Sequence, residues 1–218
     1  QGVDQDDGET GAGDQGIMFG YAANETADFM PAAITYARIL CDKVYHYALK
    51  HNNKLGVDIK TQVTLDYGNK ENFENCLPQS IHTIVVSAPS QEDMDITEVR
   101  ELLQGLIDDS GLPTSLYDSK KTIVHLNPTG RYVSHSPLHD SGLTGRKLIV
   151  DSFGGYAPIG GGAQSSKDYT KVDRSGLYAG RWIAKHIVAA GLAKKCSVQL
   201  SYAIGVAKPT SVSVDTYG

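Results

Sequence analysis

Apolar residues recur at steps of three and four positions between Pro31 and Asn52, and this regularity is the strongest structural signal in the chain. The positions on the shared face are Ile34, Ala37, Leu40, Cys41, Val44 and Ala48. The spacing predicts an amphipathic helix that begins at Pro31 and ends near Asn52, Asn53 and Gly56. Such a helix must bury its apolar face against another element, so a sheet or a second helix has to lie beside it.

Alternating apolar and polar residues predict strands around this helix. The predicted strands are 59–67, 81–88, 122–126, 147–151, 197–206 and 211–216. A second helix, capped by Asp95 or Thr97, ends at Gly111 and Pro113, and a third runs from about Arg174 to Ala190. The strands pair locally and the helices are grouped between them, which favours an α+β layer structure over a regular βαβ series.

A Gly/Pro/Ser/His-rich stretch, 127–145, divides the chain into two units with a boundary near residue 134. Residues 1–16 are acidic and Gly-rich without apolar periodicity, and we interpret them as a mobile loop that runs into a tight glycine turn. The chain starts at Gln1 and stops at Gly218 directly after a strand pattern, so both ends look cut.

The charge balance excludes whole-protein attraction to polyanions. The 218 residues carry a formal net charge of −5, so no overall field gathers nucleic acid or an anionic membrane. The three cysteines are widely spaced without a CxxC pair, which argues against a disulfide framework or a zinc site. No apolar run approaches the roughly 20 residues that a membrane span needs. A cytoplasmic protein fits these features best.

Residues 11–16, GAGDQG, satisfy the pattern GxGxxG, but we reject a dinucleotide-binding turn. That fingerprint needs a buried strand directly before it, whereas acidic residues precede it here. An aspartate within the turn, Asp14, would also repel a pyrophosphate. A flexible turn is the structural alternative.

A second constellation of glycines and charges predicts a polyphosphate site. It comprises Asp140, Arg146 and Lys147 in HDSGLTGRK, and Lys167, Asp168, Lys171, Asp173 and Arg174 after three consecutive glycines. Glycines let a backbone approach a ligand closely, and the basic side chains can surround phosphates. Asp140 and Asp173 are candidates to hold Mg²⁺ or a ligand amine. The alternative interpretation is a set of solvated loop charges.

Other catalytic patterns find little support. His135 and His139 are four positions apart with Pro137 between them and form no HExxH motif, which argues against a metal site. The spacing around the glycine run does not match GxxxxGK[ST], so a P-loop is excluded. The chain also has no GxSxG elbow.

Five segments, 11–22, 127–131, 142–155, 160–175 and 201–211, together resemble S-adenosylmethionine synthetase. The resemblance implies three similar α+β domains in a pseudo-threefold arrangement. In those terms, residues 1–10 are a remnant of a mobile active-site loop, 11–133 are the central domain, and 134–218 are a truncated C-terminal domain. The family's N-terminal domain, with its HPDK motif, is absent from these residues, so we expect the chain alone to be inactive.

The resemblance implies a methionine adenosyltransferase: methionine sulfur attacks C5′ of ATP, and the triphosphate leaves as pyrophosphate and phosphate. It also implies two Mg²⁺ per site and a K⁺, with active sites between the subunits of a homodimer or tetramer. The implied catalytic residues are Lys60, Arg146, Lys167 and Lys171. The implied ATP-binding residues are Asp58, Lys60, Arg131, Tyr132, Asp140, Arg146, Lys147, Ala163, Lys167 and Ile204. The implied methionine-binding residues are Asp14, Asp140 and Lys171, and the implied metal ligand is Asp173.

Two other functions remain open at this point. A catalytically inactive fragment or regulatory relative would keep the scaffold and the dimer surface. An ATP-dependent kinase or ligase would share the phosphate site but release ADP or AMP.

The chain also departs from the family pattern at Ile159, where His is frequent, and at Gln164, Ser165 and Ser166, where Phe-Ser-Gly is frequent.

Overall fold

The computed structural model of the chain describes residues 3, 8–136 and 139–218, which form two compact units. The middle unit comprises Ala32–Phe73 and Leu77–Gly142. The terminal unit comprises the described residues of Gln1–Pro31 together with Glu74–Cys76 and Leu143–Gly218. Each unit has its own sheet and its own core, and each is described separately below.

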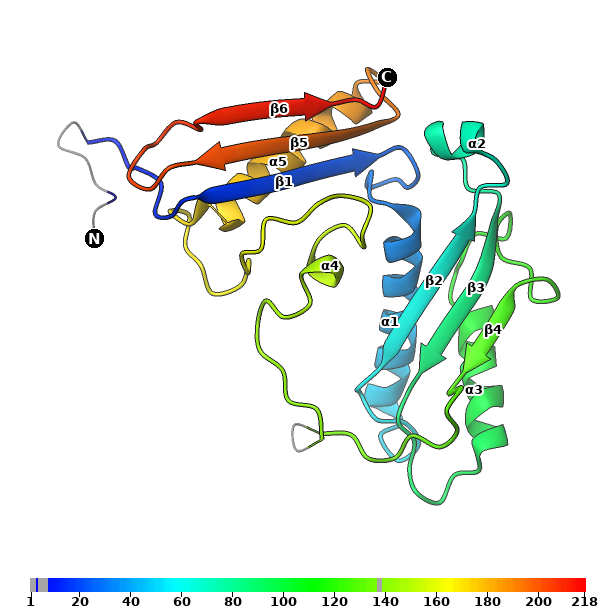
Figure 1. The fold of residues 1–218 in the computed structure, drawn as a ribbon. Helices are drawn as coiled ribbons and strands as arrows, with labels where there is room; N and C mark the ends of the chain where they lie inside the picture. The colour runs from blue at the N-terminus through cyan, green and yellow to red at the C-terminus, as the bar shows by residue number, and fades with distance from the viewer. Residues whose placement is uncertain (1–2, 4–7, 137–138) are drawn as a thin grey trace. The chain divides into compact units, whose positions relative to one another are not determined.

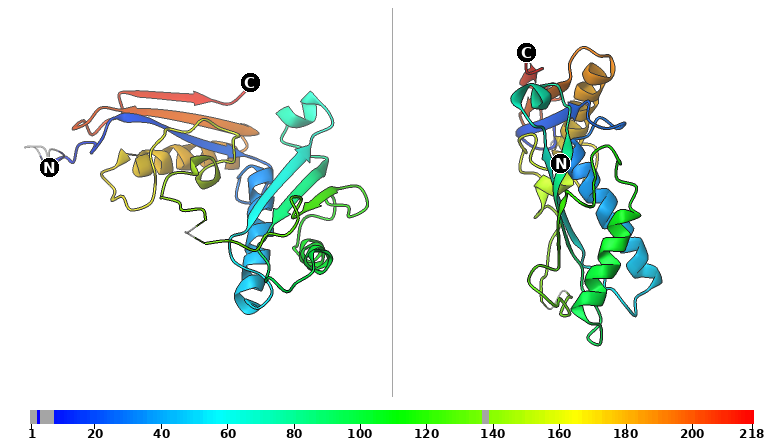
Figure 2. Two further views of the ribbon diagram at one scale, coloured as in Figure 1. Left: turned by 60° about the horizontal axis from the view of Figure 1, so that its bottom comes forward. Right: turned by 90° about the vertical axis from the view of Figure 1, so that its right-hand side faces the viewer.

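The middle unit is a three-stranded sheet with its two long helices on one face (Figures 1 and 2). The strand order is β2 (Lys60–Asp66), β3 (Ser80–Ser87), β4 (Ile123–Leu126), with β2 and β3 antiparallel and β3 and β4 parallel. Helices α1 (Ala32–Lys50) and α3 (Ile96–Asp108) cover the sheet, and the short α2 (Lys70–Glu74) follows β2.

The predicted helical faces form the core of this unit. Leu40 and Val44 of α1 are buried against Leu103 and Ile107 of α3 and the buried residues of β3. Helix α3 begins after Asp95, whose carboxylate accepts a hydrogen bond from the backbone N–H of Thr97 at 2.7 Å. This bond satisfies one of the free donors of the first turn, and it confirms Asp95 as the cap.

The terminal unit is an antiparallel three-stranded sheet with α5 across one face (Figure 1). The strand order is β1 (Gly16–Ala23), β5 (Lys195–Tyr202), β6 (Ser211–Asp215), and α5 spans Val172–Ala189. Ala184 and Val188 of α5 are buried against the apolar residues of β1 and β5. A four-residue helix, α4 (Leu148–Asp151), lies in the loop that precedes α5.

The α+β class, the three long helices and five of the six predicted strands are confirmed, with boundary shifts of a few residues. The strand predicted at 147–151 is wrong because these residues form α4. The carbonyl of Lys147 accepts the N–H groups of Val150 and Asp151, both at 3.0 Å. A short apolar run without a neighbouring strand satisfies its backbone in this local turn, and periodicity alone does not separate the two cases.

Strand β1 was missed because it is buried on both faces. Its burial does not alternate, since Gly20 to Ala23 are all buried. Helix α5 packs on one face, and Tyr21 and Ala23 join a cluster with Phe153 on the other. A strand covered on both faces loses the period of two that marks a half-exposed strand.

The location of β1 also bears on the division of the chain. It precedes residue 133 in sequence, yet it pairs with β5 along its whole length and belongs to the terminal unit. The division into domains at residue 134 stays a prediction. Residues 1–2 and 4–7 of the predicted mobile loop lie outside the described residues.

In the described part of the chain, no helix combines the length and apolar character needed to cross a membrane.

The packing of β1 on α5 generates a stability prediction. A Cβ added at Gly20 would lie 1.9 Å from the carbonyl carbon of Gly180, so the strand and the helix backbone could not keep their separation. We expect Gly20→Ala to lower the free energy of unfolding by at least about 2 kcal/mol, measured by urea titration.

Gly105→Ala is the matched control. Gly105 is exposed within α3, and a Cβ there would meet nothing within 4 Å. Alanine should therefore stabilise the helix by about 0.5–1 kcal/mol. Equal effects of the two substitutions would show that close packing at Gly20 is not what requires glycine.

Candidate functional site

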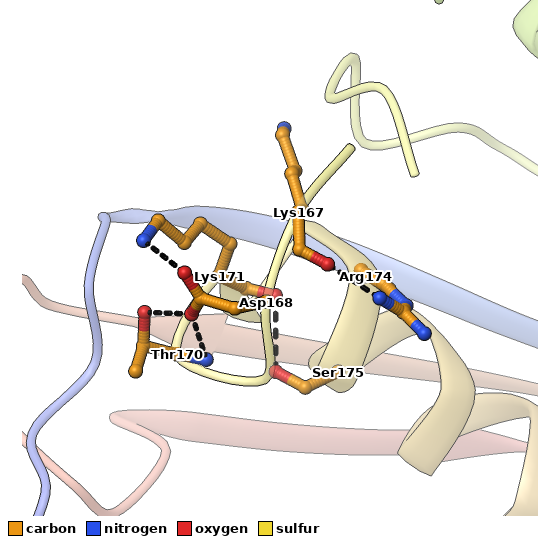
Figure 3. A network of polar contacts seen from close by, with 6 residues as sticks. All are labelled: Lys167, Asp168, Thr170, Lys171, Arg174 and Ser175. Carbon is orange, nitrogen blue, oxygen red and sulfur yellow. Dashed lines mark hydrogen bonds and ion pairs between the residues drawn. The ribbon is translucent and has the colours of Figure 1, made fainter. Parts of the chain in front are cut away.

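Basic side chains gather at the N-terminal end of α5. Lys167 Nζ lies 2.5 Å from Asp173 Oδ2 and forms an ion pair in which the two side chains are 24% and 15% exposed. The guanidinium of Arg174 donates to the backbone carbonyl of Lys167. Both contacts tie the loop before α5 to the first turn of the helix, and Figure 3 shows the one between Lys167 and Arg174.

Asp168 organises the same loop. Its carboxylate accepts hydrogen bonds from the backbone N–H and the hydroxyl of Thr170, at 2.9 and 2.6 Å, and pairs with Lys171 Nζ at 2.8 Å (Figure 3). Lys171, together with Thr170, holds the pKa of the Asp168 carboxyl well below its usual range. The exposed carboxylate therefore stays ionised and holds Lys171 and Thr170 on one short turn.

Glycines bring a second loop against this turn. A Cβ at Gly160 would lie 2.2 Å from the carbonyl oxygen of Ile17 in β1, and one at Gly162 would lie 2.1 Å from the Asp173 carboxylate. Only glycine permits such approaches. The three-glycine run thus lies between β1 and the start of α5, as expected for a backbone that packs closely.

Gly145 and Ala163 join a third loop to the group. Gly145 has φ of 81°, and a Cβ there would lie 2.6 Å from the Cβ of Ala163. The neighbouring Arg146 and Lys147 are exposed. Loops 142–147 and 160–174 together carry five basic residues and two acidic ones, in a chain whose net charge is negative.

The GAGDQG segment completes the terminal-unit site by backbone contacts. The N–H of Gly13 donates to the carbonyl of Thr170 at 2.8 Å, and the N–H of Gly205 donates to Ala12 at 2.7 Å. A Cβ at Gly11 would lie 2.4 Å from the Gly205 oxygen. The segment leads into strand β1, so it lacks the helix that follows the glycines of a dinucleotide-binding turn. Its contacts bring exposed Asp14 and Ile204, neighbours of Gly13 and Gly205, to the same end of the unit.

A second cluster lies in the middle unit. The hydroxyl of Tyr132 donates to the carboxylate of Asp58. Lys60 Nζ lies 5.6 Å from the centre of the Tyr132 ring and 3.8 Å from Asp140 Oδ2. Burial and the hydrogen bond to Asp58 raise the pKa of Tyr132 to about 12. The phenol therefore stays neutral at physiological pH and acts as a donor to the carboxylate.

An open groove of about 470 Å³ borders this cluster. The described residues that line it are Val57, Asp58, His135, Ser136 and Asp140. Arg131, beside Tyr132 in sequence, directs its guanidinium to the backbone carbonyl of Glu92.

The structure therefore gathers the predicted site residues into two groups. The terminal unit contains Asp14, Arg146, Lys147, Ala163, Lys167, Lys171, Asp173 and Ile204, and the middle unit contains Asp58, Lys60, Arg131, Tyr132 and Asp140. Among the described residues no group of three or more His, Cys, Asp and Glu side chains is arranged to hold a metal ion.

Sequence reasoning missed some contributors. The patterns did not show that Arg174 binds the Lys167 carbonyl, because a backbone contact across seven residues leaves no periodic signal. Ser166 has φ of 61°, in the left-handed region that favours glycine, at the position where the family pattern has Gly. Gln164, Ser165, Ser166 and Arg174 line a second open pocket of about 430 Å³.

The fold and these sites define an α+β protein with a glycine-rich, cationic loop site suited to a polyphosphate and a separate acidic groove. Two family models match nearly the whole chain: the central domain of S-adenosylmethionine synthetase over residues 9–132, and the C-terminal domain over residues 134–218. The chain belongs to the S-adenosylmethionine synthetase family.

Individual relatives agree with this assignment. The chain is 51% identical over 214 residues to an S-adenosylmethionine synthase of Nitrobacter hamburgensis, a match that covers 96% of the chain and 51% of the relative. It is 49% identical over 211 residues to that of Lacticaseibacillus casei, with 95% and 52% covered. The chain thus spans about half the length of these relatives.

A solved structure of an unusual S-adenosylmethionine synthetase from Campylobacter jejuni is 75% identical in sequence. It superposes with a TM-score of 0.95 over 98% of this chain and 55% of that one.

The contacts of Asp168 predict a pH dependence of stability. Because folding lowers its pKa, the ionised carboxylate contributes stability above its unfolded pKa of about 3.9, and this contribution is lost as pH falls through and below that value. We expect Asp168→Asn to lower the thermal unfolding midpoint at pH 7 and to have a smaller effect at pH 2.5, where part of this contribution is already lost.

Asp14→Asn is the control, since this exposed carboxylate accepts a hydrogen bond from the N–H of its own neighbour, Gln15. It should change the midpoint little at either pH. If the thermal unfolding midpoints of wild type and Asp168→Asn differed equally at pH 7 and pH 2.5, the ionised Asp168 carboxylate would not be the source of this stability.

Proposed function

We propose that this chain is the central and C-terminal part of an enzyme that makes S-adenosylmethionine from ATP and L-methionine, with release of pyrophosphate and phosphate. The observation that supports this best is the family match over residues 9–132 and 134–218, combined with five basic side chains on loops that pack at glycines. This arrangement suits a multiply charged leaving group.

The terminal unit would bind the triphosphate. Lys167 and Lys171 are held on one turn before α5, and Arg146 lies on the loop that Gly145 packs against Ala163. Preorganised cations that face a departing polyanion lower the barrier without a covalent nucleophile. Alignment of the methionine sulfur with C5′ would supply the remaining catalysis.

The middle unit would bind the uncharged part of ATP. Asp58 and Asp140 carry acceptor oxygens, and Tyr132 provides an aromatic ring whose hydroxyl is engaged by Asp58. Asp14 and Asp140 would face the methionine or the nucleoside, and Ile204 would pack on the adenine. Lys60 pairs with Asp140 in this structure and would contact phosphate or the methionine carboxylate.

Asp173 suits a Mg²⁺ ion that arrives with the nucleotide. Mg²⁺ in nucleotide sites is commonly held by one or two carboxylates together with phosphate oxygens and water. Asp173 is a single half-buried carboxylate among cations, which fits that donor set. When bound, the ion would neutralise charge on the phosphates. Two Mg²⁺ and one K⁺ per site are the ions that we propose.

We further propose a cytoplasmic homodimer or tetramer with active sites shared between subunits. The relatives are about twice as long as this chain, so other segments would complete each site. A catalytically inactive or regulatory relative is the second candidate, and the cluster of basic residues on the loops argues against it, because a pure scaffold has no need for such charge.

The function is tested by incubating the chain with ATP, methionine, Mg²⁺ and K⁺, alone and with the N-terminal domain of a relative added in trans. We expect no turnover by the chain alone, since loss of part of the alignment, worth roughly 7–11 kcal/mol, takes the rate below detection. Product should appear with the added domain. Release of ADP or AMP in place of pyrophosphate and phosphate would identify a kinase or ligase, and no product in either case would favour the inactive relative.

Removal of charge at Lys167 should impair turnover more than folding. We expect Lys167→Met to lower kcat by roughly a hundredfold, or about 3 kcal/mol, in the complemented assay. Lys185→Met, on α5 but beyond the loop site, is the control and should keep normal activity. If Lys167→Met unfolded the protein but left normal activity per folded molecule, Lys167 would not be a catalytic residue.

Asp173 should determine the dependence on Mg²⁺. Since Lys167 occupies Asp173 in this structure, we expect Mg²⁺ alone to bind weakly and Mg²⁺ with tripolyphosphate to bind more strongly. Asp173→Asn should remove most of this enhancement in a calorimetric titration. Identical titrations of wild type and Asp173→Asn would exclude Asp173 as a metal ligand.

A further inference from the structure

Arg174 is a half-buried residue in the first turn of α5, and the proposed function gives it no contact with ATP or methionine. Its guanidinium donates a hydrogen bond through Nη1 to the backbone carbonyl of Lys167. The same guanidinium lies over the ring of Tyr178, one turn further along the helix, at 5.6 Å from the ring centre. Because the planar group stacks on an aromatic ring, its donor is held at this carbonyl.

Lys167 is therefore held at two points by neighbouring residues of α5. Arg174 binds its carbonyl, and Asp173 binds its ammonium at 2.5 Å. In Figure 3 the carbonyl oxygen of Lys167 points to Arg174, whereas the side chain extends away from it. A bound polyphosphate would take the ammonium from Asp173, and the contact with Arg174 would then be the one that still fixes the backbone of the lysine.

The backbone directly before Lys167 needs such a restraint. Ser166 has φ of 61°, in the left-handed region, where the Cβ makes serine less stable than glycine. Ser166 is also exposed, so packing around its own side chain does little to hold this conformation. Without a restraint the turn would favour a negative φ at Ser166, and Lys167 would turn away from its present position. The hydrogen bond from Arg174 to the next residue opposes that change.

We propose that Arg174 is a positioning residue, which holds the turn at Lys167 so that the ammonium of Lys167 faces a bound polyphosphate. The inference rests on the proposed function and extends it to a residue to which the resemblance gives no role. The sequence places Arg174 among the cations that can surround phosphates, whereas its contacts direct the guanidinium to a carbonyl and an aromatic ring. Arg174 thus acts through Lys167.

The test is a double-mutant cycle on the 218-residue chain, in which binding of tripolyphosphate in the presence of Mg²⁺ is measured by phosphorus NMR. We expect Arg174→Leu to weaken binding by about tenfold, since Lys167 loses its fixed orientation. In the Lys167→Met background the same substitution should weaken binding by less than about twofold, because the residue that Arg174 positions is already gone. Additive losses would overturn the proposal and identify Arg174 as a direct phosphate ligand.

A rescue variant separates positioning from a purely structural role. Ser166→Gly should restore part of the affinity lost in Arg174→Leu, because glycine adopts the left-handed conformation without the restraint. No restoration would contradict the role of Arg174 in holding this turn. If Arg174→Leu fails to fold, Arg174→Lys takes its place in the cycle. It keeps the charge and a donor but loses the planar contact with Tyr178, so a smaller, still non-additive loss is expected.

Lys185→Met is the matched control, because it removes one positive charge further along α5. It should bind tripolyphosphate as wild type does, and an equal loss in Lys185→Met and Arg174→Leu would show that only the total charge matters. Such a result, or additive losses in the cycle, would overturn the role of Arg174 while leaving the proposed function intact. Failure of wild type to bind tripolyphosphate would overturn both.

Discussion

Close backbone contacts at glycines hold the terminal unit together, and the arrangement of its site depends on them. Gly20 lets β1 approach α5 at Gly180, and Gly160 lets the glycine run approach β1. Gly13 brings the N-terminal segment onto the turn at Thr170. Side chains at these points would separate the elements by more than a hydrogen-bonded contact allows. The basic residues are thus placed by backbone packing instead of by their own interactions.

Two of the five basic residues of this site are paired with its two carboxylates. Lys167 pairs with Asp173, and Lys171 pairs with Asp168. In the proposed function, a bound polyphosphate would offer Lys167 more charge than Asp173 does, and a Mg²⁺ ion bound with it would replace the cation that Asp173 loses. Exposed pairs such as Lys171–Asp168 contribute little to stability by themselves, which suits groups that exchange partners.

The groove of the middle unit differs in chemistry from the basic loops, because it combines carboxylates with aromatic rings. The hydrogen bond from Tyr132 to Asp58 fixes the ring, and the contact of His135 with Gly56 fixes the imidazole. Both contacts join residues more than 70 positions apart in the sequence. The rigidity of this wall follows from tertiary packing, which brings the start of β2 beside the segment after β4.

The sequence alone determined the helices and most strands, and it predicts the chemistry of the charged loops. Leu40 and Val44 repeat with the helical period, and three adjacent glycines next to two lysines predict an anion site without any coordinates. These signals are local: they arise from the period of an element or from the composition of a short loop. Only the tertiary structure decided that Gly16–Ala23 is a strand buried on both faces, that 147–151 turn into a helix, and that His135 lies beside Asp58. Each of these depends on which distant segments become neighbours, and the free energy of that pairing is not contained in any one stretch of the chain.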